Sequence, residues 1–295
     1  MIPILRYLWE CRGEAEAGLT KTLTAKLQIS PLVAALLQQR GIADVEQGRR
    51  YLASRLADMP DPLMMADMAT AVERLCQAVR GGEPIAVHGD YDVDGITGSA
   101  LLVETLRSLG ASVDYYIPLR LVDGYGLSGE ALRRAAGSGA RVAVSVDCGV
   151  SAHEEARLAK ELGLDLIITD HHQPPEQLPE ALAVINPHRA DCAFPDKGLA
   201  GVGVAFMLMV ALRSRLRHSG WFQDRPEPDL RRSLDLVALG TIADIAPLSG
   251  LNRTLVKVGL AVLNDAQRPG IAALRQVADV KEVNCGNVGF RLAPA

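Results

Sequence analysis

The sequence has few of the features that mark membrane, secreted or zinc-binding proteins. No apolar run approaches the ~20 residues needed to cross a bilayer. The first residues include early acidic side chains, unlike a secretory signal. The five cysteines are scattered and form no Cys-x-x-Cys pair, which argues against a zinc site or a disulfide framework. We therefore expect a cytoplasmic protein with reduced cysteines that binds no membrane.

Aromatic residues are scarce, and basic residues do not outnumber acidic ones. Only 4% of residues are aromatic, so few side chains are available to stack on nucleic-acid bases; the candidates are Tyr91, Tyr125, Trp221 and Phe222. One local basic run, of a kind more often found on solvated surfaces, consists of Arg213, Arg215, Arg217, Arg231 and Arg232. The net charge of −4 argues against a plain nucleic-acid-binding domain. That objection weakens if carboxylates gather at a metal site, because bound cations reverse the local charge.

From Gly81 onward, short β-branched runs alternate with amphipathic helical patterns. The predicted strands are 85–88, 112–117, 142–146, 166–169 and 183–185. The predicted helices are 97–109, 128–136, 152–162, 201–217, 234–243 and 251–263. This alternation predicts an α/β fold with a doubly wound, mostly parallel five-stranded sheet. Helical spacing also appears in the N-terminal segment, at 32–37 and 68–75.

The first predicted strand runs into His88-Gly-Asp90-Tyr-Asp92-Val-Asp94-Gly. Three aspartates at alternate positions of an extended backbone project to one side and repel one another unless cations neutralise them. A calcium loop of the Asp-x-Asp-x-Asp-Gly kind needs a Glu at its twelfth position, where this chain has Leu101, and a helix before it rather than a strand. The remaining alternatives are a solvated acidic turn and a metal site.

Two further predicted strands are followed by acidic and histidine side chains, which packing of the sheet does not require. Asp147 follows the third strand, and Asp170-His171-His172 follows the fourth. Asp147 alone is equally consistent with a helix N-cap. Because ligands bind beyond the carboxyl ends of parallel strands, we expect these groups to converge with the first cluster. Mixed carboxylate and imidazole ligands predict a dinuclear site suited to Mn²⁺ and tolerant of Mg²⁺.

These segments together resemble the ordered motifs of the DHH phosphoesterase superfamily. The matching segments are HGDYDVDG (88–95), VDCG (146–149), TDHH (169–172), INPH (185–188) and GTIADIAP (240–247). Within the superfamily the chain is most similar to the RecJ branch, whose members are 5′-to-3′ exonucleases of single-stranded DNA. The resemblance covers nearly all 295 residues.

The resemblance implies a role for each matching residue. The implied metal ligands are Asp92, Asp94, Asp147, His171 and Asp244. Asp147 is expected to bridge the two ions, and His88 and Asp90 are expected in or beside the ligand shell. His172 is expected to face the scissile phosphate, with Asp170 orienting the histidines.

Substrate contacts are less directly indicated. Asn186 and His188 match a phosphate-binding segment of the family, although a lone histidine is as often structural. The glycine-rich stretch containing Gly201 and Gly203 precedes a predicted helix and could offer backbone N–H groups to a phosphate. Close packing between helix and sheet explains these glycines equally well.

The resemblance implies a two-metal enzyme that degrades single-stranded DNA to mononucleotides in repair and recombination. A helicase and a single-strand-binding protein are the partners it suggests. One rival is a relative acting on short oligoribonucleotides, cyclic dinucleotides or pyrophosphate; another is a metal-free scaffold of a replication complex, against which the complete ligand set argues. We expect a helical segment over 1–80, the catalytic domain over 81–248, and a linker helix over 249–295 leading to a second domain that this chain lacks.

Overall fold

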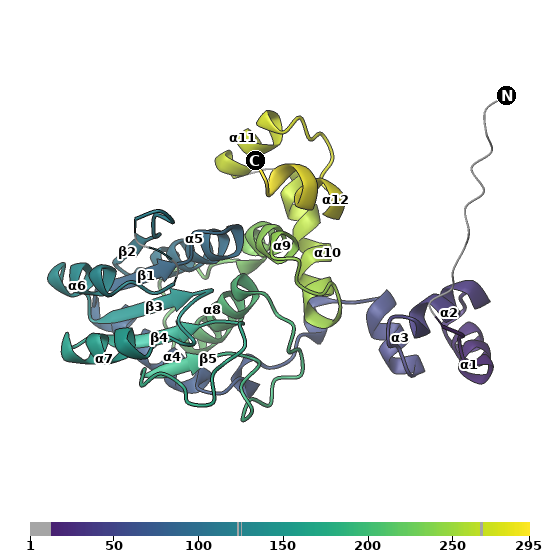
Figure 1. Ribbon diagram of the computed structural model, residues 1–295, viewed down its shortest axis with the longest axis horizontal. Helices are drawn as coiled ribbons and strands as arrows, with labels where there is room; N and C mark the ends of the chain where they lie inside the picture. Colours follow the sequence, from purple (N-terminus) through teal and green to yellow (C-terminus); the bar gives the residue numbers. More distant parts are fainter. Residues whose placement is uncertain (1–12, 123, 125, 266–267) are drawn as a thin grey trace. The chain divides into compact units, whose positions relative to one another are not determined.

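The computed structural model describes residues 13–122, 124, 126–265 and 268–295. The chain forms two compact units, Met1–Asp58 and Met59–Ala295. Figure 1 labels the helices and strands of both.

The first unit contains three short helices, α1 (Ala17–Leu27), α2 (Pro31–Gln38) and α3 (Val45–Leu52). Ser30 caps α2 by accepting a hydrogen bond from the Val33 N–H, and Pro31 occupies the first helical position, where its missing N–H has no cost. Leu23 and Leu37 are buried in this unit. The helical spacing at 32–37 therefore corresponds to α2.

The second unit is built on one five-stranded sheet. Its strands are β1 (Ile85–Gly89), β2 (Val113–Tyr116), β3 (Val142–Val146), β4 (Asp165–Thr169) and β5 (Ala183–Ile185). The order is β2-β1-β3-β4-β5, and every neighbouring pair is parallel. The prediction of an α/β fold with a mostly parallel sheet is confirmed, and the sheet is in fact entirely parallel. The middle strand, β3, is buried along its whole length, which explains its continuous run of apolar residues.

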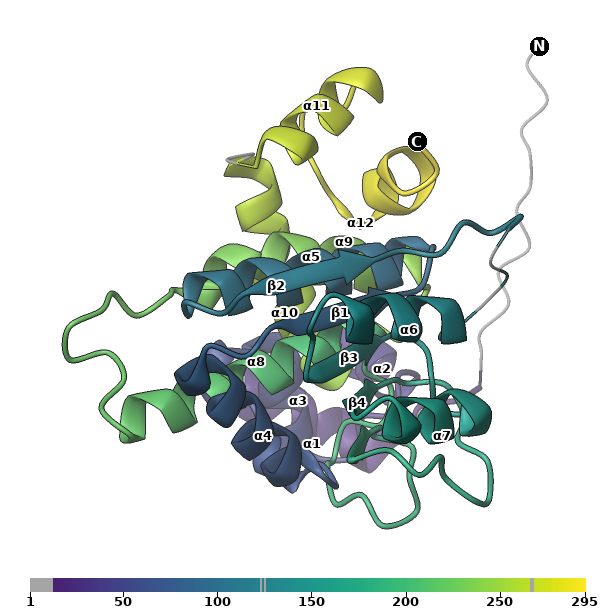
Figure 2. The same ribbon diagram turned by 90° about the vertical axis from the view of Figure 1, so that its left-hand side faces the viewer.

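Helices cover the sheet on both faces. Those of the unit are α4 (Met68–Gly81), α5 (Val93–Ser108), α6 (Gly129–Gly137), α7 (His153–Glu161), α8 (Gly201–His218), α9 (Leu234–Ala243), α10 (Gly250–Asp265), α11 (Pro269–Val277) and α12 (Cys285–Asn287). α6 and α7 share an apolar core with β3 and β4. α4, α5 and α8 pack together against the sheet, and α9 packs against α5. Both views show α11 and α12 beyond α9, away from the strands (Figures 1 and 2).

One helix starts earlier than the sequence pattern suggested. We expected a helix from position 97, but α5 begins at Val93 because the Asp92 side chain caps it, accepting from the Gly95 N–H at 2.9 Å. Asp94 is therefore in the first helical turn, and the expectation of an extended backbone through this residue was wrong. The C-terminal helix α11, which has Pro269 at its start, was also missed.

Among the described helices, none combines the length and the apolar character needed to cross a bilayer.

Candidate metal centre

Three neighbouring strands bring acidic residues to one edge of the sheet. Asp90, Asp147 and Asp170 directly follow β1, β3 and β4. Each backbone N–H still bonds to the next strand: Asp90 to the Val146 carbonyl (3.3 Å), Asp147 to that of Thr169 (3.0 Å) and Asp170 to that of Ile185 (3.1 Å). The sheet ladder therefore extends one residue beyond its strands and fixes where these aspartates lie.

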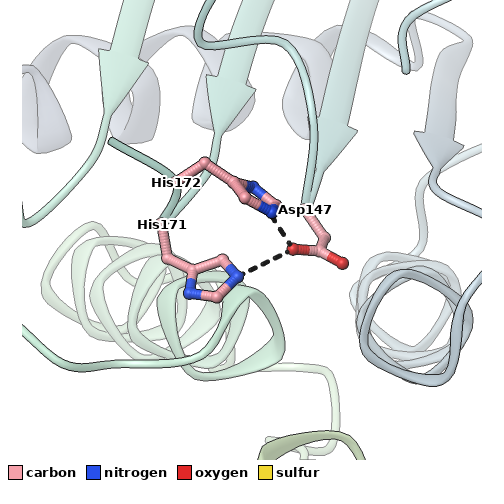
Figure 3. A group of neighbouring side chains, drawn as sticks. All are labelled: Asp147, His171 and His172. Carbon is pink, nitrogen blue, oxygen red and sulfur yellow. Dashed lines mark ion pairs between the residues drawn. The ribbon is translucent and has the colours of Figure 1, made fainter. Parts of the chain in front are cut away.

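Asp147 lies at the middle of this edge, beside both histidines. Figure 3 shows His171 and His172 pointing toward its carboxylate from the end of β4. The distance from Asp147 Oδ1 is 3.0 Å to His171 Nε2 and 3.9 Å to His172 Nδ1. Asp147 has a left-handed backbone (φ 61°), which aspartate tolerates better than most residues. This conformation redirects the chain where β3 ends.

Asp94 joins the same cluster from the first turn of α5. Its carboxylate accepts hydrogen bonds from the N–H groups of Gly201 (2.6 Å) and Val202 (2.9 Å) at the start of α8. His171 Nε2 lies 3.7 Å from Asp94 Oδ2 and 3.9 Å from Asp244 Oδ2. One buried carboxylate thus caps the neighbouring helix and faces the imidazole.

Two glycines let the helices approach this closely. A Cβ added at Gly201 would lie 2.8 Å from Asp147 Cβ, and one added at Gly240 would lie 2.9 Å from Asp94 Oδ1. These distances are shorter than ordinary carbon contacts. Sequence reasoning assigned no role to Gly240, although this glycine begins the GTIAD segment.

The acidic and imidazole groups form three overlapping sets whose ligand atoms lie within 4.8 Å of one another. The sets are Asp147–His171–His172, Asp94–His171–Asp244 and Asp90–Asp92–Asp147. Asp147 and His171 each belong to two of them. Every metal ligand expected from the sequence, apart from His88, is therefore in at least one set.

Burial makes this cluster electrostatically costly. Burial, reinforced by Asp94 and Asp92, raises the pKa of Asp147 to about 10. Burial also raises the pKa of Asp94 to about 6, although His171 opposes the shift. The pKa values of Asp90 and Asp244 are raised for the same primary reason. Carboxylates gathered in this way require a compensating positive charge.

The residues present fit bound cations. Among the described residues, the buried atoms Asp147 Oδ1, His171 Nε2 and Asp90 Oδ1 accept or donate no hydrogen bond, although the first two lie 3.0 Å apart. A buried carboxylate oxygen or ring nitrogen is rarely left unpaired in a native protein. Oxygen and nitrogen donors of this kind suit Mn²⁺ and Mg²⁺, the carboxylates suiting both ions. We therefore identify this edge of the sheet as a candidate dinuclear metal centre.

Asp170 supports both histidines through its carboxylate. Its Oδ1 lies 2.8 Å from His172 Nδ1 and accepts the backbone N–H groups of both histidines, while Oδ2 accepts the Val150 N–H. Burial alone would raise the pKa of Asp170, but the hydrogen bonds to His172 hold it below its ordinary value. The same contact raises the pKa of His172.

The expected substrate residues occupy different settings. Asn186 is buried and donates to the His172 carbonyl at 2.8 Å, while its own side-chain carbonyl accepts the His188 N–H. His188 is exposed, and its pKa is lowered by desolvation and by the charges of His171 and Lys197. The Gly201 N–H is already donated to Asp94, and Gly203 packs against Leu199. Packing is therefore sufficient to account for both glycines.

His88 lies apart from the three sets. Its Nε2 accepts the Ser128 N–H at 3.2 Å, and its Nδ1 is 4.0 Å from Cys148 Sγ. The ring also packs against Tyr116. His88 also lines a cavity of about 290 Å³ between β1, β2 and α6.

The other candidates for nucleic-acid contact are mostly engaged elsewhere. The Trp221 indole donates to the Leu109 carbonyl at the far end of α5, and Arg225 covers its ring. Most arginines of the basic run are paired with acids: Arg213 and Arg217 with Glu227, Arg215 with Glu73 and Arg231 with Asp229. Tyr91 is half-buried beneath Arg120 at the metal edge, and Tyr125 lies outside the described residues.

Comparison with known proteins identifies a matching family and similar sequences. Residues 84–241 match the family described as DHH family, N-terminal domain. The chain is 42% identical over 288 residues to the single-stranded-DNA-specific exonuclease RecJ of Bacillus subtilis (strain 168), covering 97% of this chain and 35% of that protein.

Two solved structures are also similar. RecJ of Thermus thermophilus in complex with Mn²⁺ matches with a TM-score of 0.78 and 34% identity, over 95% of this chain and 39% of that one. The same organism's RecJ in complex with Mg²⁺ matches with a TM-score of 0.67 and 31% identity, over 95% and 35% of the two chains. The chain thus spans less than half the length of each of these relatives.

Proposed function

Because this chain belongs to the DHH family, we propose that it is a metal-dependent phosphodiesterase that removes nucleotides from the 5′ end of single-stranded DNA. The observation that carries the proposal is the buried cluster around Asp147, where carboxylate and imidazole atoms converge without hydrogen-bond partners. The similarity to RecJ exonucleases, named as specific for single-stranded DNA, supports the choice of substrate.

We propose that the three overlapping sets of the centre hold two cations, either Mn²⁺ or Mg²⁺. The proposed ligands are Asp90, Asp92, Asp94, Asp147, His171 and Asp244. Asp147 is shared between two sets and is the proposed bridging ligand. When bound, such ions supply a nucleophile at neutral pH and neutralise charge on the phosphate.

The surrounding residues have complementary tasks. Asp170 holds Nδ1 of His172 and favours its protonated form. The His172 side chain is 46% exposed beside a carboxylate that is 1% exposed, so it can reach a phosphate oxygen that Asp147 cannot contact. A protonated imidazole there stabilises negative charge developing on that oxygen. The Asn186 side chain fixes the His172 backbone by donating a hydrogen bond to the His172 carbonyl.

The recessed position of Asp147 favours a single strand. A phosphodiester must approach cations that would be held by a carboxylate almost fully buried at the sheet edge, and a paired helix is too wide to bring its backbone there. This restriction implies two partners. One opens duplexes, as a helicase does, and the other binds the exposed single strand. We assign the catalytic domain to 81–248, since the ligand sets lie within 90–244, and propose a cytoplasmic location.

The direct test is a substrate panel assayed with Mn²⁺. It contains a 5′-labelled single strand, the same strand in a blunt duplex, a cyclic dinucleotide, a short oligoribonucleotide and pyrophosphate. We expect release of the labelled 5′ mononucleotide from the single strand and an intact duplex. Faster turnover of pyrophosphate or of a dinucleotide than of the strand would replace this proposal with the corresponding activity.

The ligand set also predicts a metal preference. Mn²⁺ should support faster cleavage than Mg²⁺, because His171 contributes an imidazole that Mn²⁺ accepts more readily. Ca²⁺ should bind but support little cleavage, because its larger and more flexible shell does not hold the reacting groups in place. Initial rates at equal free metal concentrations test this order. A higher rate in Mg²⁺ than in Mn²⁺ would contradict the assigned imidazole ligand.

A further inference from the structure

Asp67 makes unusual contacts for its position in the chain. It precedes α4 at the N-cap, where an aspartate ordinarily accepts a hydrogen bond from its own helix, yet its side chain makes no such bond. Its backbone is left-handed (φ 61°). The carboxylate instead turns to the sheet, where Oδ2 accepts the Val184 N–H of β5 at 3.0 Å. Asp67 thus lacks the usual helix cap and has an unfavourable backbone conformation, and its carboxylate bonds instead to a strand that is distant in the sequence.

Arg189 completes the arrangement. It is 8% exposed, and its Nη1 donates both to Asp67 Oδ2 and to the Val184 carbonyl, each at 2.5 Å. Its other nitrogens bind Asp191 in a bidentate pair. The backbone N–H and C=O of Val184 on the outer edge of β5 are thus both bonded to side chains.

A short turn over residues 186–189 connects the Asp67–Arg189 pair to the metal centre. The Arg189 N–H bonds to the Asn186 carbonyl, and the Asn186 side chain donates to the His172 carbonyl at 2.8 Å. Asn186 is fully buried, so it has little freedom to adjust. A continuous series of hydrogen bonds therefore runs from Asp67 through Arg189 and Asn186 to His172.

We propose that Asp67 and Arg189 are positioning residues, which set the 186–189 turn and through it the placement of His172 at the metal centre. Asp67 lies before residues 84–241, which match the family, so the segment preceding the catalytic domain contributes directly to the site. The expected change in kcat rests on the proposed phosphodiesterase activity. The expected change in the 186–189 turn can be measured without any substrate.

The experiment compares Asp67→Ala and Asp67→Asn with Asp165→Asn in the full chain. Asp165 is the matched control: it forms an aspartate–arginine pair between the same helix, through Arg74, and the first residue of β4, at the strand ends opposite the metal centre. For each variant, kcat and KM are measured with Mn²⁺ on a 5′-labelled single strand. Hydrogen exchange at the His188 N–H is measured in metal-free protein, and thermal unfolding is recorded.

We expect Asp67→Ala to lower kcat about tenfold, as other outer contacts to active-site residues do, and to leave KM unchanged. Exchange at His188 should accelerate by a similar factor. Asp67→Asn should have a smaller effect, because its amide oxygen can still accept the Val184 N–H. Asp165→Asn should change thermal stability without changing kcat or exchange at His188.

Two results would overturn the inference. One is unchanged kcat and exchange in a folded Asp67→Ala protein, or in Asp67→Asn if the alanine variant fails to fold. The other is an equal loss of kcat in Asp165→Asn, which would indicate general destabilisation. If the unsubstituted chain does not cut the strand, the proposed function fails, and the exchange comparison alone decides the positioning role.

Discussion

Replacing Asp147 with asparagine should abolish cleavage and, at the same time, make the metal-free protein harder to unfold. The activity loss follows from the place of Asp147 in two of the three ligand sets. Removing a charged group shared by two cations should cost about 4 kcal/mol of transition-state stabilisation, roughly a thousandfold in rate. Asparagine keeps the shape and tolerates the left-handed backbone at this position.

The opposite effect on stability has an electrostatic origin. Asp147 is 1% exposed and has Asp94 and Asp92 as charged neighbours. Without a cation, this carboxylate destabilises the fold, so its neutral isostere should raise the free energy of unfolding by about 1–2 kcal/mol. Cleavage rates in Mn²⁺ and urea unfolding in a chelator measure the two effects separately.

Asp170→Asn is the matched control for this stability change. Asp170 is equally buried, but its carboxylate accepts three backbone N–H groups and holds His172. An amide cannot satisfy all of these donors, because its NH₂ group would face an N–H, so its metal-free stability should fall by about 1–3 kcal/mol. An Asp147→Asn protein that cleaves within tenfold of the unsubstituted chain would show that Asp147 is not a bridging ligand, and one that unfolds more easily without metal would contradict the electrostatic cost.

Gly240→Ala should damage the fold and the metal centre together. The added Cβ would lie 2.3 Å from Thr97 Oγ1, 2.9 Å from Asp94 Oδ1 and 2.9 Å from Val202 Cγ1. All three neighbours are buried, so none can move without displacing α5 or α8. We expect a loss of about 2–3 kcal/mol in the free energy of unfolding. Displacement of Asp94 should weaken Mn²⁺ binding about tenfold.

Gly137→Ala serves as the control for this substitution. Gly137 is also helical, but an added Cβ would meet no atom within 4 Å. Alanine there should leave stability unchanged or raise it by up to about 1 kcal/mol. Calorimetric titration with Mn²⁺ and urea unfolding compare the two variants. Equal behaviour of Gly240→Ala and Gly137→Ala would mean that α9 can shift away from α5 without consequence for the site.

The strand ends were the most predictable part of the molecule. Apolar β-branched runs that stop at an acidic residue determine both the strand and the edge where its ligand lies, because parallel strands end on the same side. Asp147 and Asp170 were placed correctly for this reason. The positions of the predicted helices after β3 and β5 followed from similar periodicity.

Asp94 could not be placed by the same argument. Alternate spacing suggested an extended backbone, but the Asp92 cap starts a helix at Val93 and turns Asp94 toward α8. A residue that can end a strand segment can also cap a helix, and only the tertiary contact decides between these roles. The pairing of Asp67 with Arg189 was beyond sequence reasoning altogether, because 122 positions separate two residues of common types.

The side chains along β5 have a consequence for how the protein behaves at high concentration. An exposed edge strand offers unpaired N–H and C=O groups on which another chain can extend the sheet, a common start of aggregation. At this edge the outward groups of Val184 are already bonded to Asp67 and Arg189. A strand from a second molecule would have to displace the partly buried Asp67–Arg189 ion pair before it could add here. The same two side chains therefore protect this edge against self-association.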